Sequence, residues 1–434
     1  MRTFFDSIRN YSLSPLGTHP KGKRARYKYL SLLDLGADSL KAVVAQREEE
    51  TIRILGYGIA SARACALDGD RAAILTLAVA AEEALTMAED HTMLDAGHKI
   101  VPDDVVFCLP ARFVRSKLIT LRQRRSDPVA PISTHEVNKL CERAEDLLRK
   151  QLSTQGEQNE TWEPLALTNS SVLAVDGHPV SEAIGLKGRV LAVALLGTAV
   201  PSRIMNSVAT IAKRLEVSIY ATLSGPQSLA TLVPQRDAIL LDVGYQGTNL
   251  SLIRHGALVA TLWWPQGGEY FTSSLARAFR CIPEHAEALK RAYVSNTLSQ
   301  EDVLLVKRAL EKPVRDWLSS LVSGLRNLAS EYSRSVSGIL TYDGETLAIG
   351  HSEDTLPGRV FITGGGSLLP DLVSAVRSME TMVGIHFDRA IEIESLRHSL
   401  GARRPGYPLL LNAPHQPMGD LLASAIGLSA SVAW

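Results

Sequence analysis

The chain has 434 residues, equal numbers of acidic and basic side chains, and therefore a formal net charge of zero. This length allows two or three compact units with sizeable cores, and the neutral balance gives no indication of a nucleic-acid partner. No apolar run approaches the ~20 residues of a membrane-spanning helix, and the N-terminus lacks the apolar core of a secretory signal. Free thiols in a reducing, cytoplasmic compartment are indicated by four cysteines without paired or metal-ligand spacing: Cys65, Cys108, Cys141 and Cys281.

Residues 1–28 precede the first expected strand and combine two signals for membrane attachment. Met1, Phe4, Phe5 and Ile8 follow the spacing of one helical face. Five basic residues then fall within eight positions: Lys21, Lys23, Arg24, Arg26 and Lys28. An amphipathic segment followed by a polybasic run predicts binding to an anionic membrane surface. The alternative is an extension whose charge is incidental.

The pattern at residues 29–101 predicts the start of a first half. Strands are expected at residues 30–35, 41–46 and 51–58, alternating with tight turns as in an antiparallel meander. The first of these strands ends in Asp34-Leu35-Gly36. Apolar residues at helical spacing then predict a helix over residues 71–89.

Residues 102–196 are predicted to form a small α+β unit inserted into the first half. A buried strand at 105–109 is expected to pair as a hairpin with 114–121. A helix follows at 133–151 with Thr134 as its N-cap, and then strands at 162–175 and 189–196. The unit is interpreted either as a contact surface for partners or as a simple packing module.

The first half resumes at residues 197–235, and a second half is predicted at 236–418. Strands at 238–244, 248–254 and 257–264 repeat the opening meander, with a second Asp-x-Gly at Asp242 and Gly244. A helical subdomain over about 280–340 ends in a long helix at 300–336, expected to be interrupted at Pro313. A strand at 360–363 enters Gly364-Gly365-Gly366, and a final helix within 419–434 is expected to pack on the first half.

The three glycine turns carry the chemistry. Only glycine lets the main chain approach a phosphate or ribose closely and adopt a positive φ. Asp34 and Asp242 each stand two residues before a glycine, where a carboxylate can hold a metal-bound water beside a polyphosphate. Two Asp-x-Gly turns and one Gly-Gly-Gly turn, in this order, predict a nucleotide held between two related halves.

The order of these turns resembles the actin, Hsp70 and sugar-kinase superfamily, and the flanking sequence resembles the bacterial cell-division family FtsA. The resemblance runs from about residue 30 to 429 and is most specific at Ile184-Gly185-Leu186-Lys187-Gly188. It implies an actin-like ATPase fold: two ribonuclease-H-like halves around a nucleotide cleft, with an inserted SHS2-type subdomain. The cofactors that it implies are ATP and Mg²⁺.

By this resemblance, Asp34 and Asp242 would hold Mg²⁺, mostly through water, and weak ATPase activity at most is expected. The first turn would contribute Gly36, Ser39 and Lys41, although strand alternation turns Lys41 outward. Glu287 and Lys290 match positions that contact ribose and adenine, the alternative being an ordinary exposed ion pair. The other expected nucleotide-binding residues are Gly244, Gln246, Gly247, Thr248, Gly267, Gly268, Gly364, Gly365 and Gly366.

Several residues depart from the FtsA pattern. Tyr245 and Gln246 stand where the family has glycines, and Asn249 replaces a terminal aspartate. Asp38 brings a negative charge towards the phosphates, and Ser274 stands where the family often has aspartate. These differences predict slow hydrolysis, or a nucleotide with a structural role only.

The resemblance implies a protein that assembles head to tail and links a tubulin-like division filament, or another part of the division machine, to the membrane. The long helix at 300–336 instead resembles PilM, the FtsA-like actin relative of type IV pilus machines. A PilM-like adaptor of a pilus or secretion platform is therefore the second hypothesis. A small-molecule kinase on the same superfold is the third.

Overall fold

The computed structural model describes residues 29–48, 51–62, 66–154, 160–165, 171–336, 338–342, 345–349, 355–382, 385–400, 409–412 and 418–431. The predicted membrane segment at residues 1–28 lies outside these ranges.

The first half is built on a sheet with the strand order β10-β4-β1-β2-β3-β18. The strands β1, β2 and β3 are antiparallel neighbours, while β4 lies parallel to β1 and β10 parallel to β4. Their bounds are β1 Tyr29–Asp34, β2 Ser39–Glu48, β3 Thr51–Ser61, β4 Asp104–Leu109, β10 Ser218–Ser224 and β18 Leu409–Leu411. The strands β1 and β4 are apolar almost throughout because both of their faces are buried.

The second half repeats this arrangement in the order β13-β12-β11-β16-β17. Three antiparallel strands are again followed by two that run parallel to the first. Their bounds are β11 Ala238–Val243, β12 Thr248–Arg254, β13 Ala257–Trp264, β16 Arg359–Thr363 and β17 Glu392–Ser395. The order β3-β2-β1-β4-β10 therefore corresponds to β13-β12-β11-β16-β17, which confirms the predicted pair of ribonuclease-H-like halves.

A third sheet belongs to the inserted unit, with the order β5-β9-β7-β8 and β6 paired to β9. Its strands are β5 Arg115–Arg124, β6 Trp162–Pro164, β7 Ser171–Val175, β8 His178–Val180 and β9 Val190–Pro201. The predicted hairpin of 105–109 with 114–121 is wrong, because β4 lies between β1 and β10 while β5 pairs with β9. β4 is buried on both faces, as expected of a central strand. The strands of this sheet begin at Arg115, after β4.

Two local predictions in the inserted unit also need correction. The helix α3 (Thr134–Thr154) is capped by Ser133, not Thr134: Ser133 Oγ accepts the Glu136 N–H at 3.2 Å, and the Glu136 carboxylate accepts the Ser133 N–H at 2.9 Å. This reciprocal pair is a capping box. The single strand expected at 162–175 is two strands, β6 and β7.

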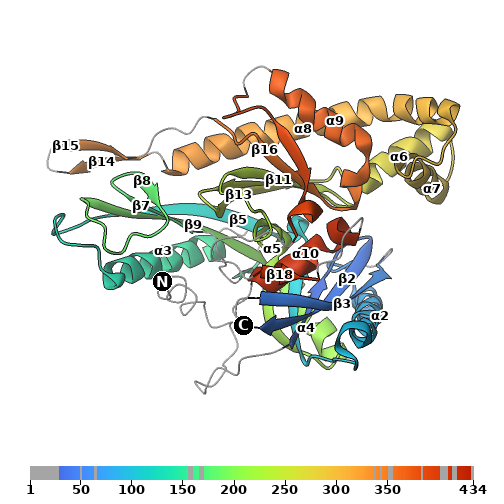
Figure 1. Ribbon diagram of the computed structural model, residues 1–434, viewed down its shortest axis with the longest axis horizontal. Helices are drawn as coiled ribbons and strands as arrows, with labels where there is room; N and C mark the ends of the chain where they lie inside the picture. The colour runs from blue at the N-terminus through green and yellow to red at the C-terminus, as the bar shows by residue number, and fades with distance from the viewer. Residues whose placement is uncertain are drawn as a thin grey trace.

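Helices cover the two large sheets (Figure 1). The helix α2 (Arg71–Ala96) packs closely on β3, because a Cβ at Gly56 or Gly58 would lie within 2.2 Å of an α2 carbonyl oxygen. The other helices are α4 Ser202–Arg214, α5 Gly225–Ala230, α6 Gly268–Phe279, α7 Pro283–Val294, α8 Gln300–Val336, α9 Pro370–Ser378 and α10 Met418–Ser431. Beyond α8, β14 (Gly338–Tyr342) and β15 (Glu345–Ile349) form a separate two-stranded sheet.

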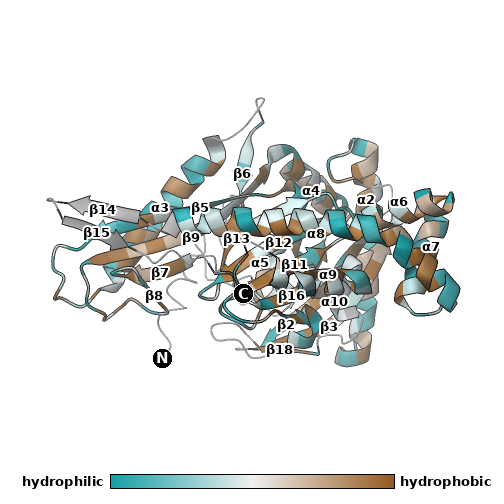
Figure 2. Cartoon of the chain, turned by 90° about the horizontal axis from the view of Figure 1, so that it is seen from above, coloured by the Kyte–Doolittle hydropathy of each residue, from teal (hydrophilic) through white to brown (hydrophobic). Residues whose placement is uncertain are grey.

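The helix α8 is 37 residues long and continues through Pro313, so the predicted interruption there is wrong. A proline inside a helix removes one N–H donor and normally costs about 3 kcal/mol. Here the flanking residues Leu310, Trp317 and Leu321 are fully buried against the second half, which offsets that cost. Seen from above, α8 follows the long axis of the molecule, and the face turned to the viewer is largely hydrophilic (Figure 2).

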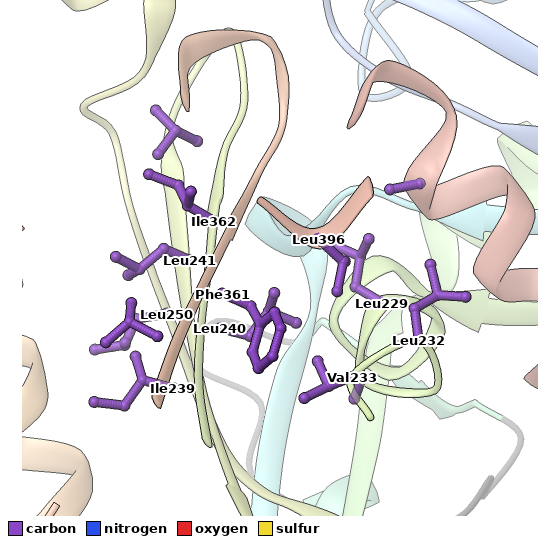
Figure 3. Close-up of a cluster of buried hydrophobic side chains, with 14 of the residues drawn as sticks. Leu229, Leu232, Val233, Ile239, Leu240, Leu241, Leu250, Phe361, Ile362 and Leu396 are labelled. Atoms are coloured by element: carbon purple, nitrogen blue, oxygen red, sulfur yellow. The ribbon is translucent and has the colours of Figure 1, made fainter. Parts of the chain in front are cut away.

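One hydrophobic cluster joins the two halves. Figure 3 shows Leu240 of β11 and Phe361 of β16 pointing towards Leu229 and Leu396, whereas Leu241 points to the opposite side of the sheet. Alternate residues of β11 thus enter cores on both faces of the second sheet. Because α5 directly follows β10 of the first sheet, this packing sets how the two sheets face each other.

Candidate functional site

The first turn places Lys41 of β2 beside Asp34 of β1. Asp34 ends β1, and Lys41 lies opposite it on β2, with Lys41 Nζ 3.3 Å from Asp34 Oδ2. A Cβ at Gly36 would lie 2.6 Å from Lys41 Nζ and 2.5 Å from the Ser39 carbonyl oxygen, so only glycine fits there. Lys41 therefore points into the turn, and the expectation from strand alternation that it turns outward is wrong.

The second turn is fastened to the start of α6. The Gly244 N–H donates to the Gly247 carbonyl at 2.9 Å, and the Gly268 N–H donates to the Gly244 carbonyl at 2.8 Å. Gly267 has no room for a side chain, because a Cβ would lie 2.4 Å from the Gly244 oxygen. The first residues of α6 are thus positioned by the main chain of the phosphate-type turn.

The third turn meets the second directly. Gly364 has φ +85° and ψ 159°, a conformation that only glycine adopts readily. A Cβ there would lie 2.5 Å from Asp242 Oδ1 and from the Val243 carbonyl oxygen. The next glycines begin a short 3₁₀ turn at Gly365–Leu368, and a Cβ at Gly366 would meet the Val243 side chain at 2.5 Å.

Charges from both halves interact at this junction. Burial raises the pKa of Asp242 to about 6; the charge of Asp34 adds to this effect and that of Lys41 opposes it. Burial also disfavours the charged form of Lys41, but Asp34 and Asp242 outweigh it, so the pKa of Lys41 lies above its usual value. Burial and Asp34 likewise raise the pKa of the neighbouring Cys108 thiol. Asp34, Lys41 and Asp242 therefore form one electrostatic group.

The two Asp-x-Gly turns also carry main-chain donors. Within the described ranges, the N–H groups of Gly36, Ala37, Gln246 and Gly247 have no hydrogen-bond partner. Successive N–H groups in a turn form the kind of concave donor set that holds phosphate oxygens. The donor chemistry of these turns therefore fits a polyphosphate.

The carboxylates of Asp34 and Asp242 fit a magnesium ion that keeps most of its water ligands. They do not fit a metal site built from protein ligands alone. Among the residues that the structure describes, no three His, Cys, Asp or Glu side chains group as metal ligands. Mg²⁺ commonly keeps several waters and uses one or two carboxylates together with substrate phosphates. The pair Asp34 and Asp242 has the donor chemistry that such an ion needs.

Glu287 and Lys290 form part of a larger polar cluster beside the second turn. Glu287 Oε2 lies 2.7 Å from Lys290 Nζ and accepts the Thr272 hydroxyl at 2.6 Å. Lys290 Nζ also donates to the Gly268 carbonyl at 3.0 Å. Burial opposes the charge of Glu287, but hydrogen bonds from Lys290 and Thr272 prevail and lower the pKa of Glu287 to about 2. The alternative of an ordinary exposed pair is wrong, since only 16% of the Glu287 side chain and 13% of the Lys290 side chain are exposed.

The departures from the FtsA pattern have defined surroundings. Asn249 lies opposite Asp242 in the sheet, donates to Ser251 Oγ at 2.9 Å and accepts the Thr261 hydroxyl at 2.9 Å. Its amide is therefore committed to the sheet. Among the described residues, Gln246 Oε1 is buried without a hydrogen-bond partner. Ser274 donates to the Tyr270 carbonyl in its own helix.

Sequence reasoning missed one contact of this site. Trp317 of α8 is fully buried and donates its indole N–H to Thr248 Oγ1 at 2.9 Å, and Thr248 in turn donates to the Gln266 carbonyl. This connects the long helix to the residue that ends the second turn. The only signal in the sequence was an aromatic residue on an apolar helical stripe, which core packing alone explains.

None of the helices in the described ranges has the length and apolar character to cross a membrane. No family model matches the chain.

The chain is 22% identical over 372 residues to the cell division protein FtsA of Streptococcus pneumoniae, a match that covers 82% of this chain and 74% of that protein. A chain of the solved PilM–PilN type IV pilus biogenesis complex superposes with a TM-score of 0.60 at 17% identity, over 93% of this chain and 98% of the other. With the repeated strand order of the two sheets, these similarities show that the chain has the actin-like ATPase fold and that its sequence is similar to FtsA.

Proposed function

We propose that the chain binds ATP with Mg²⁺ between its two halves and acts as an FtsA-like adaptor, linking a cell-division machine to the membrane. The observation that carries the nucleotide role is the meeting of three glycine turns around Asp34, Lys41 and Asp242. The sequence similarity to FtsA supports the division role.

Each part of the site has a defined task in this proposal. The N–H groups of Gly36, Ala37, Gln246 and Gly247 donate to phosphate oxygens, and Lys41 offsets their charge. Asp34 and Asp242 hold the magnesium ion through water; the ion supplies charge neutralisation at the phosphates. The turn Gly364 to Gly366 lies against the adenosine, with Glu287 and Lys290 towards ribose and adenine.

The nucleotide is proposed to set the relative position of the halves and thereby self-assembly. A head-to-tail contact uses two different surfaces of the chain and does not close, so it produces filaments. Sedimentation of the protein with ATP, with ADP and without nucleotide measures this assembly. Equal sedimentation in all three conditions contradicts the link between nucleotide and assembly.

A cytoplasmic adaptor of a type IV pilus or secretion platform is the second candidate. Its support is the continuous α8 and the superposition on the PilM–PilN complex over nearly the whole chain. Pull-downs from the native host separate the two roles, because the first predicts division proteins and the second pilus components. A small-molecule kinase predicts phosphate transfer to a metabolite, which a screen of phosphoryl acceptors tests.

Lys41→Met should weaken Mg-ATP binding by roughly tenfold to a hundredfold, since it removes charge-assisted contacts to phosphate. Calorimetry on the full chain measures this change. Lys307→Met, an exposed lysine on α8, is the matched control and should bind as the wild type does. Absence of wild-type binding at millimolar ATP contradicts the nucleotide role, and equal affinity of Lys41→Met contradicts the site.

Hydrolysis of ATP should be slow, below ~1 s⁻¹, the low end of ordinary enzymes. Asn249 stands in place of a carboxylate and both ends of its amide are engaged in the sheet, so it cannot act as a base towards water. A steady-state phosphate-release assay measures the rate. Faster turnover would show that another group activates the water.

Residues 1–28 should attach the protein to the cytoplasmic face of an anionic membrane. Each basic residue near the surface contributes roughly 1 kcal/mol, an effect that salt screens. Co-sedimentation with phosphatidylglycerol vesicles should fall for a chain starting at Tyr29 and for Phe5→Glu. If all three proteins sediment equally, the attachment lies elsewhere; if none does, contact with a membrane depends on a partner.

A further inference from the structure

The outer face of α2 exposes an unusual number of large apolar side chains. They are Leu75, Val79, Met87, Met93 and Leu94, with exposed fractions from 38% to 79%. At 3.6 residues per turn these positions fall within a sector of about 120°. The opposite side of α2 packs on β2 and β3, so these side chains lie on a second, uncovered face of the same helix, which they share with Glu83 and Asp90. Figure 1 shows α2 on the outside of the first sheet, at an edge of the molecule.

The same helix is strongly acidic. It contains five carboxylates, Glu82, Glu83, Glu89, Asp90 and Asp95, and one basic residue, Arg71. Lys99, in the loop after the helix, pairs with Asp90 at 2.8 Å and with Glu89 at 3.6 Å. Glu82 and Glu83 are exposed, and neither has an ion-pair partner among the described residues. The C-terminal end of the helix adds the negative pole of its dipole. The face therefore fits an occupant that is apolar along one side and basic.

The segment 1–28 has this chemistry. Its apolar stripe is Met1, Phe4, Phe5 and Ile8, and its basic run over 21–28 directly precedes Tyr29. At ~3.3 Å per residue it reaches up to roughly 90 Å, whereas α2 spans only about 39 Å. Length therefore allows the segment to run along the whole helix.

The topology brings the segment to the correct end of α2. Tyr29 begins β1, β4 lies beside β1 with Val105 opposite Ser31, and β4 follows α2 after the short loop 97–103. The Ile100 N–H donates to Thr92 Oγ1 at 2.9 Å and ties that loop to α2. Tyr29 and Ala96 accordingly pack against one hydrophobic cluster. The segment joins the fold beside the end of α2 that carries Met93 and Leu94.

We propose that residues 1–28 dock on this outer face of α2, with the basic run extending from the C-terminal end of the helix towards Glu82 and Glu83 and the apolar stripe over Val79 and Leu75. The stripe that enters a membrane in the proposed function is then covered by the protein itself. Docking and membrane attachment exclude each other, so an anionic surface releases the segment by competition. The competition rests on the proposed membrane role, whereas the docking does not.

Photo-crosslinking in the full chain tests the docking. With p-benzoylphenylalanine in place of Phe5, irradiation should join position 5 to a peptide within 71–96 of the same chain, mapped by mass spectrometry. Val79→Asp should reduce this product at least about tenfold, while Leu304→Asp, an exposed apolar site on α8, should leave it unchanged. Absence of the product, its location elsewhere, or its formation between isotopically light and heavy chains would overturn the proposal.

Vesicle binding then tests the competition. Freeing the segment raises its apparent affinity for a surface, so Val79→Asp should increase sedimentation with phosphatidylglycerol vesicles by roughly threefold or more, and Leu304→Asp should not. Unchanged sedimentation of Val79→Asp, despite loss of the crosslink, overturns the competition. If even Val79→Asp fails to bind vesicles, the membrane role fails while the crosslink still decides the docking.

Discussion

Replacing Asp242 with asparagine should abolish magnesium-dependent ATP binding and, at the same time, stabilise the nucleotide-free protein at pH 7.5. The first effect follows because Asp242 is one of the two carboxylates proposed to hold the magnesium ion. The second follows because burial and the charge of Asp34 raise the pKa of Asp242 to about 6, so the ionised group opposes folding at neutral pH. The shift from 3.8 to about 6 is about two pKa units, each of which corresponds to about 1.4 kcal/mol, so the gain is on the order of 3 kcal/mol.

The sign can be checked against pH. The pKa of Asp242 is higher in the folded protein than in the unfolded chain, so the destabilisation is complete above about pH 6 and disappears as the pH falls towards 4. The difference in melting temperature between Asp242→Asn and wild type should therefore be larger at pH 7.5 than at pH 5. Glu311→Gln, an exposed carboxylate on α8, is the control and should change neither property. A less stable Asp242→Asn protein would contradict the assigned electrostatics.

Gly364→Ala should destabilise the protein by about 3 kcal/mol or more and weaken ATP binding with it. The backbone at φ +85° strains any other residue, and the new Cβ would lie 2.5 Å from both Asp242 Oδ1 and the Val243 oxygen. Chemical denaturation measures the free energy of unfolding, and calorimetry measures the binding.

Gly256→Ala separates the two contributions. Gly256 has nearly the same φ, +84°, but a Cβ there meets no atom within 4 Å, so only the strain of about 1–2 kcal/mol remains. Equal losses for Gly256→Ala and Gly364→Ala would show that the close contact with Asp242 contributes nothing.

The sequence predicts the fold well because its strongest signals are local. The apolar runs of β1 and β11 each end in Asp-x-Gly, so the equivalence of the two halves could be predicted without knowing which strands pair. The pairing partner of β4 could not be predicted, because the sequence of a strand buried on both faces does not indicate which strand lies beside it. The predicted interruption at Pro313 was wrong for a related reason. The local free-energy cost of a proline in a helix can be estimated from the sequence, but the tertiary packing of Trp317 and Leu321 that outweighs this cost cannot.

The candidate site divides in the same way. Glycines and aspartates at strand ends could be named from spacing, since main-chain geometry restricts which residues fit. The direction of Lys41 and the contact of Glu287 with Thr272 could not, because they depend on how α6, α7 and the turns approach one another. The indole bond from Trp317 to Thr248 joins residues 69 positions apart and leaves no trace in any local pattern.

The hydrogen bond from Trp317 to Thr248 fixes α8 to the second turn near the middle of the helix. The helix is about 55 Å long, and Trp317 lies near its middle, so the second turn holds it close to its centre. A tilt of about 5° at this pivot would move each end of a rigid helix of this length by roughly 2 Å, in opposite directions. A tilt too small to alter the packing around Thr248 would thus produce a measurable displacement at both ends of α8.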